Sequence, residues 1–182
     1  MDTKEKLSTL TISLHWIIAL TVIALTAVGF YMGEFDAYAL FPIHKSIGVL
    51  IFAVIIVRVI WRLKNGWPVP IREYTKIEQT LSHAVHWVLI LCTLIMPISG
   101  FLMSGAGGFG VDIFGLVIVP ANIDPTDPTK HIPYNEGVGH LMHEVHEVVG
   151  LLLAAAIALH IAGALKHHII DKDRTLLRMR GK

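Results

Sequence analysis

Residues 143–167 read HEVHEVVGLLLAAAIALHIAGALKH and decide the fold of this chain. No charged residue lies between Glu147 and Lys166. A helix needs about 20 predominantly apolar residues to cross the hydrocarbon core of a bilayer, and this stretch supplies them. Histidines occur inside it, where an ionisable side chain is costly and marks a functional site. The stretch therefore predicts a membrane-spanning helix that carries chemistry.

The rest of the sequence repeats this apolar pattern. Residues 12–32, 44–63 and 81–103 form three more blocks of spanning length with few charges. Of the 182 residues, 54% are hydrophobic and only 16% are charged, against about a quarter charged in soluble domains. The first block is too long for the apolar region of a cleavable signal, so we expect it to remain a span. We predict an all-α, integral membrane four-helix bundle that forms a single domain over residues 1–182.

Lysine and arginine predict the orientation of the bundle, because they accumulate on the cytoplasmic side of a membrane. They are frequent in the N-terminal tail, in the second connector and in the C-terminal tail. The opposite side has only Lys45 and Lys130 together with several carboxylates. Both termini are therefore expected in the cytoplasm, and the third connector, residues 104–142, is expected outside.

The third connector is long for a helical bundle, where about 2 to 8 residues are usual. It contains an apolar stretch, residues 109–120, that is too short to span the membrane. We expect this stretch to lie along the outer membrane surface or to cap the bundle. The glycines at 105, 107, 108 and 110 follow no strand of a dinucleotide-binding unit, so they do not indicate a nucleotide loop.

Two histidines of the fourth span have a spacing that suits two cofactors. His146 and His160 are 14 residues apart. This is close to four turns of helix, so both side chains face the same way about 21 Å apart. Neutral imidazole is a ligand of haem iron, and cofactors in helical bundles are held by inward side chains of facing helices. The spacing therefore favours two haems at two depths.

Each of these histidines needs a partner at its own depth. His44, at the outer start of the second span, matches His146, and His15, near the inner end of the first span, matches His160. His86 competes for the inner position, and His140 and His143 compete for the outer one; spacing alone leaves both contests open.

A zinc site is the metal alternative at the start of the fourth span. His140, His143, Glu144 and His146 are grouped there, but the zinc-protease pattern His-Glu-x-x-His is not completed after His143.

Several short motifs together resemble one family. They are ISLHW (12–16), HKSIG (44–48), RVIWR (58–62), HAVH (83–86), HE (146–147), and a tail with KHH (166–168), DKD (171–173) and TLLRM (175–179). In this order, over nearly the whole chain, they resemble the bacterial cytochrome b561 family of dihaem membrane proteins. The resemblance implies that His15 and His160 ligate an inner haem b, and that His44 and His146 ligate an outer haem b. It also implies a superoxide oxidase type of activity, in which electrons from superoxide reach ubiquinone.

Further residues have expected roles at the two faces. His86 and His167 are candidates for proton exchange with a quinone, because histidine titrates near neutral pH. Lys76 is a candidate hydrogen-bond donor to the quinone, as is Arg72, although both also fit the positive-inside pattern. Trp16 and Trp87 are candidates to stack on the quinone ring, and interfacial tryptophans are their ordinary alternative.

Two cations lie close to the expected haems. Arg58 lies midway along the second span, and we expect it to face a haem propionate, because a buried arginine needs a charged partner. Lys45 adjoins His44 and is the candidate to steer superoxide by its charge. The acidic outer loops work against such steering.

Two functional hypotheses follow. The first is an enzyme of the bacterial inner membrane, a superoxide:quinone oxidoreductase that oxidises superoxide at the periplasmic face and reduces ubiquinone near the cytoplasmic face. The second is a cytochrome b relay subunit that exchanges electrons between the quinone pool and a periplasmic partner protein. Lipid and quinone are expected partners in both, and nucleic acid in neither.

Overall fold

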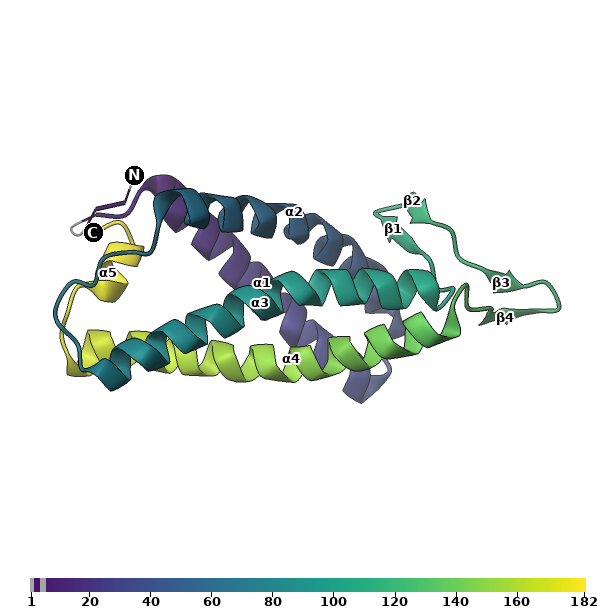
Figure 1. Cartoon of the computed structure of the whole chain (residues 1–182). Coiled ribbons are helices and arrows are strands. Elements are labelled where there is room, and N and C mark those ends of the chain that lie inside the picture. The colour runs from purple at the N-terminus through teal and green to yellow at the C-terminus, as the bar shows by residue number, and fades with distance from the viewer. Residues whose placement is uncertain (1, 4–5) are drawn as a thin grey trace.

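The computed structural model of the protein describes residues 2–3 and 6–182 and is mostly helical. Within these residues, four long helices form an elongated bundle: α1 (Thr9–Phe35), α2 (Phe41–Asn65), α3 (Lys76–Ala106) and α4 (Glu136–Leu165) (Figure 1). All four are long and apolar enough to cross a membrane. Only 11–22% of the residues in their apolar windows are buried, so most of their apolar side chains are at least partly exposed. An apolar outer surface of this kind is suited to contact with lipid.

The helices extend beyond the apolar blocks into polar sequence, because polar residues cap their first turns. Ser8 accepts a hydrogen bond from the Thr11 backbone at the start of α1. Thr75 and Glu78 form a reciprocal capping box at the start of α3. Such caps satisfy backbone N–H groups that have no partner within the helix. The connectors are consequently shorter than the apolar blocks alone indicate.

The bundle core is a thin apolar layer at mid-depth. The helices α3 and α4 pack most extensively on each other, followed by α1 on α2 and α2 on α3. The buried core contains Ile18, Val22, Ile51, Ile55, Cys92 and Leu153. Leu153 lies midway between His146 and His160 along α4. The layer therefore separates the two depths at which histidines were expected.

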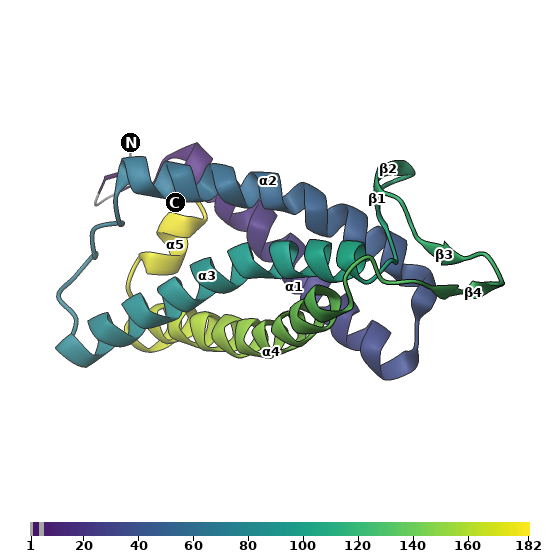
Figure 2. The same cartoon turned by 45° about the vertical axis from the view of Figure 1, so that its right-hand side comes forward.

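Both chain termini lie at the same end of the bundle, as an even number of spans requires (Figure 2). We call this the terminal end. The tail reaches it through a π-helical segment, η2 (Lys166–Ile170), and a short helix, α5 (Thr175–Met179). At the opposite end, a short 3-10 helix, η1 (Tyr38–Leu40), joins α1 to α2.

The opposite end also carries β-structure that the helical prediction did not include, and we call it the hairpin end. Strands β1 (Val111–Ile113) and β2 (Leu116–Val119) pair antiparallel, and so do β3 (Ile123–Asp124) and β4 (Asp127–His131). The turn between β1 and β2 contains Phe114 and Gly115, both with positive φ. Such a pair of residues in a two-residue loop matches the twist of the flanking strands. The apolar stretch 109–120 is therefore mostly a hairpin beside the bundle.

Candidate functional site

Histidines from different helices face one another at two depths. At the hairpin end, the ring centres of His44 (α2) and His146 (α4) lie 6.4 Å apart, with the ring planes at 77°. At the terminal end, the ring centres of His15 (α1) and His160 (α4) lie 6.1 Å apart, with the planes at 61°. We call these, after the orientation that the sequence predicts, the outer pair and the inner pair. These are the same pairs that the sequence analysis formed from histidines at equal depth in their spans.

The spacing of each pair fits a shared metal ion. Metal–imidazole bonds are about 2 Å long, so two imidazoles on one ion hold their ring centres roughly 6 Å apart. The Nδ1 atom of His44 is enclosed and has no hydrogen-bond partner among the described residues. A buried polar atom without a partner costs about 1–3 kcal/mol. The outer pair is therefore arranged for a partner that the chain does not itself provide, and haem iron fits this donor set.

The outer pair is oriented by the backbone of α3. His146 Nδ1 lies 3.1 Å from the Met96 carbonyl oxygen and 3.0 Å from Ser99 Oγ. A carbonyl oxygen only accepts, so the proton belongs on Nδ1 and the lone pair on Nε2. Such an outer contact fixes the tautomer and direction of a metal-binding histidine.

Gly100 provides the room for the His146 ring. A Cβ at this position would lie 3.0 Å from His146 Cε1, closer than an ordinary contact. Gly100 therefore lets α3 approach the ring closely enough for the Met96 carbonyl oxygen to bind it.

The inner pair has a cation beside it. Arg58 Nη2 lies 3.1 Å from His15 Nδ1, and the Arg58 side chain is partly buried. A guanidinium only donates hydrogen bonds, so in this contact the His15 Nδ1 atom is the acceptor. The structure thus places Arg58 directly at the inner pair, where an anionic group would find a positive charge.

The alternative histidine ligands that the spacing left open lie in different surroundings at the two depths. The ring centre of His86 is 5.0 Å from that of His160, so His86 belongs to the inner cluster together with His15. Its Nδ1 lies 2.6 Å from the Ser82 carbonyl oxygen. By contrast, His140 and His143 are exposed. In the described part of the chain, the ring contact of His44 is with His146.

An aromatic cluster surrounds His86 at the terminal end. The Trp67 ring centre lies 5.7 Å from that of Trp87, 6.0 Å from that of His86 and 5.7 Å from that of His83. Trp67 and Trp87 are exposed. Trp67 was not a candidate in the sequence, because it lies in the proline-rich connector and not in a span.

Trp16 contacts the inner pair through His15. Its ring centre lies 5.4 Å from that of His15, and its Nε1 donates a hydrogen bond of 2.8 Å to the Met179 carbonyl oxygen. The C-terminal tail is therefore fastened to α1 one residue away from His15.

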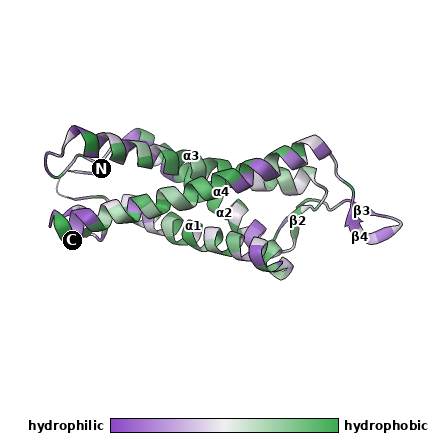
Figure 3. Ribbon diagram, turned by 90° about the horizontal axis from the view of Figure 1, so that it is seen from below, coloured by the Kyte–Doolittle hydropathy of each residue, from purple (hydrophilic) through white to green (hydrophobic). Residues whose placement is uncertain are grey.

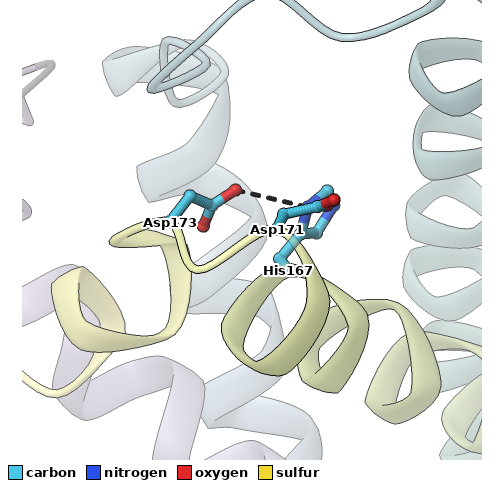
Figure 4. Close-up of side chains that lie close together, drawn as sticks. All are labelled: His167, Asp171 and Asp173. Atoms are coloured by element: carbon cyan, nitrogen blue, oxygen red, sulfur yellow. Dashed lines mark hydrogen bonds and ion pairs between the residues drawn. The ribbon is translucent and has the colours of Figure 1, made fainter.

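His167 lies in a separate charged cluster (Figure 4). Its Nδ1 is 2.9 Å from Asp171 Oδ2 and 3.3 Å from Asp173 Oδ2. Both carboxylates already have cationic partners, since Arg72 contacts both and Lys166 contacts Asp171 at 2.9 Å. The hydrogen bond from Lys166 lowers the pKa of Asp171. The cluster is therefore an ion-pair network, which anchors the tail to the α2–α3 connector.

Lys76 and Lys45 lie at opposite ends of the bundle. Lys76 is exposed at the first residue of α3. Lys45 is partly buried, and its Nζ lies 3.0 Å from the Gly110 carbonyl oxygen and 3.3 Å from Ser104 Oγ. Lys45 therefore ties the turn that bears His44 to the segment before β1.

A family model described as prokaryotic cytochrome b561 matches residues 6–182, which include all four long helices and the tail. The chain belongs to the prokaryotic cytochrome b561 family. The family and the four spanning helices make it a multi-pass protein of the bacterial inner membrane. Membership also implies haem b and a role in membrane electron transfer.

Curated members of this family resemble the chain over nearly its whole length. Cytochrome b561 homolog 2 of Escherichia coli (strain K12) is 32% identical over 186 residues, covering 100% of this chain and 94% of that relative. Probable superoxide oxidase CybB of Yersinia pestis is 29% identical over 185 residues, covering 98% and 97%. Cytochrome b561 homolog 1 of Escherichia coli (strain K12) is 27% identical over 173 residues, covering 92% and 93%.

Proposed function

We propose that this cytochrome b561 oxidises superoxide at its periplasmic face and reduces ubiquinone near its cytoplasmic face. The observation that carries the proposal is the presence of two facing histidine pairs at two depths of one bundle. They give electrons a path across the membrane. The full-length similarity to a protein named a probable superoxide oxidase supports this choice of reaction.

In this proposal the four paired histidines hold two haems b, the outer one between His44 and His146 and the inner one between His15 and His160. When bound, the haems would supply one-electron redox chemistry between the substrate sites at the two ends of the bundle. Arg58 neutralises a propionate of the inner haem. Its position beside His15 supports this role.

Superoxide enters at the hairpin end. Lys45 is the fixed cation next to His44, and its charge attracts the anion although its hydrogen bonds go to the chain. The positive-inside pattern supports placing this end in the periplasm and the terminal end in the cytoplasm.

Ubiquinone is bound at the terminal end, between the aromatic cluster and the inner pair. Trp16 lies beside His15, and Trp87 packs against Trp67, which contacts His86, so all three tryptophans offer stacking surfaces near the inner pair. Lys76 supplies a hydrogen bond to the quinone. Two superoxide anions become two dioxygen molecules, while the quinone gains two electrons and two protons. His86 and His167 pass these protons from the cytoplasm.

A second candidate is the relay subunit that serves a periplasmic protein. The specific observation in its favour is the β3–β4 hairpin, which projects beyond the bundle at the hairpin end and could meet a soluble partner (Figure 2).

Rapid mixing distinguishes the two functions. The purified, oxidised, haem-loaded protein is mixed with superoxide, with and without ubiquinone, and the b-type absorbance bands are followed. Fast reduction that decays when quinone is present supports the enzyme. Intact b-type spectra that superoxide leaves oxidised contradict it and favour the relay subunit.

A further inference from the structure

One side of α2 is exposed along most of its length, as expected of a side that faces lipid. Residues spaced three or four apart share one face of a helix. On this face α2 exposes, in order, Ile43, Leu50, Ala53, Val57 and Ile60. Ser46 belongs to the same face, yet it is only 1% exposed. Something other than the bundle must therefore cover Ser46.

The β1–β2 hairpin is what covers it. Ser46 Oγ donates a hydrogen bond of 3.2 Å to the Asp112 carbonyl oxygen and accepts one of 3.0 Å from the Phe114 backbone N–H. Strand β1 packs against α2 along this contact. Ser46 lies five residues into α2, so the contact is about 7.5 Å below the outer end of the helix. The hairpin thus folds back over the lipid-facing side of α2.

The tip of this hairpin is apolar and exposed. Phe114 is 64% exposed, Leu116 66% and Val117 61%, and Ile118 is exposed as well. The sequence has no charged residue between Asp112 and Asp124. Contiguous exposed apolar side chains of this kind mark a contact surface.

Phe114 occupies this tip at a backbone cost. Its φ of 49° lies in the left-handed region, where a bulky residue is rare. The first position of such a two-residue turn favours Asn, Asp or Gly. Strained backbone that persists at an exposed aromatic residue points to a function for the side chain.

The neighbouring β3–β4 hairpin has the opposite chemistry. Asp124 Oδ1 accepts hydrogen bonds from Thr126, and Asp127 Oδ1 accepts them from Thr129. Figure 3 shows hydrophilic colouring on β3 and β4, in contrast to the mainly hydrophobic helices. The two hairpins therefore face different surroundings.

We propose that the β1–β2 hairpin inserts its tip into the outer leaflet of the membrane, with lipid as its partner. The hairpin continues the lipid-facing side of α2, which is why lipid and not a soluble protein contacts it. Phe114, Leu116 and Val117 lie among the upper acyl chains, and the β3–β4 hairpin stays in water. This inference does not depend on the electron donor or acceptor.

Collision accessibility of spin labels tests the proposal in the haem-loaded protein reconstituted into phosphatidylcholine and phosphatidylglycerol vesicles. Val117→Cys and Lys130→Cys are labelled in a Cys92→Ala background, because the native Cys92 is buried in the core. Lys130 lies on β4 and is the matched aqueous control. We expect label 117 to be more accessible to oxygen than to a water-soluble nickel chelate, and label 130 to show the reverse.

A label at 117 that is as accessible to nickel as label 130 overturns the proposal, and points to a soluble partner for the apolar tip.

A second measurement uses the unsubstituted protein, so that a folding defect of the variants cannot obscure the result. A phospholipid with a carbene precursor at a shallow acyl position is activated in the same vesicles. Adducts are expected in residues 111–119 and not in 123–131. Adducts in the spans without any in 111–119 would also overturn it.

Discussion

Gly100→Ala tests whether the His146 ring is held as tightly as the structure indicates. The added Cβ would lie 3.0 Å from His146 Cε1 and 3.3 Å from Nδ1. Carbon atoms in contact are about 3.5–4.0 Å apart, so the ring must give way by a few tenths of an ångström. The same Nδ1 is held by the Met96 carbonyl oxygen at 3.1 Å. Relief of the clash therefore weakens that hydrogen bond or turns the ring.

The magnitude follows from two opposing terms. Replacing glycine by alanine inside a helix stabilises it by about 0.5–1 kcal/mol, whereas overpacking costs about 1–3 kcal/mol. The net cost is then roughly 0–2.5 kcal/mol, which corresponds to up to about seventy-fold weaker retention of the outer haem. The inner pair lies about 21 Å away along α4 and should keep its haem.

The assay is haem content per protein together with a spectroscopic redox titration. Gly137→Ala is the matched control, since it lies exposed in the first turn of α4, nine residues before His146, and a Cβ there makes only an ordinary contact of 3.7 Å with Asn135 Oδ1. We expect Gly100→Ala to change one of two titration steps and Gly137→Ala to change neither. Unaltered titration of Gly100→Ala, with full haem content, would refute the tight packing of this ring.

Three further predictions concern other parts of the molecule. His160→Ala should remove the inner haem and roughly halve the haem content measured by pyridine haemochrome absorbance; full content would favour another histidine as the ligand. Lys45→Gln should slow haem reduction by superoxide and flatten its dependence on ionic strength, in stopped-flow mixing, if the lysine attracts the anion; an unchanged rate argues against that role. The hydrogen bond from Lys166 lowers the pKa of Asp171. The ion pairs of Asp171 that hold the tail are therefore fully formed above the ordinary pKa range of a carboxyl group, and they are lost as the pH falls through the lowered pKa. Proteolysis of the tail should therefore accelerate only in acid. Acceleration above neutral pH would contradict this direction of the pH dependence.

The helices were predictable because their signal is strong in the sequence. A long apolar run has few alternatives to a spanning helix, and the depths of His15, His44, His146 and His160 follow from position along such runs. The structure places these four side chains in facing pairs, and their role as haem ligands stays a prediction. The choice between His15 and His86 was not predictable, because both reach the same depth from different helices.

Other features depend on contacts that a sequence does not display. The Met96 carbonyl oxygen that orients His146 is a backbone atom, and any residue type supplies one. The β1–β2 hairpin was not predicted because its turn has Phe114 where turn preferences lead one to expect a small polar residue. The partners of Asp171 in the tail are Arg72 and Lys166, and only the fold brings Arg72 there.

The apolar layer around Leu153 has an electrical consequence. It separates the outer pair from the inner pair by about 21 Å of a hydrocarbon core that is about 30 Å thick, and its buried members are apolar or, in Cys92, a thiol. In the proposed orientation, an electron that passes from the outer to the inner pair would move through roughly two-thirds of the membrane voltage. One charge that crosses the full voltage corresponds to about 2.3 kcal/mol per 100 mV, so each such transfer would cost about 1.6 kcal/mol per 100 mV when the cytoplasm is negative. The layer would then act as an electrical insulator, and a larger membrane potential would slow inward electron transfer.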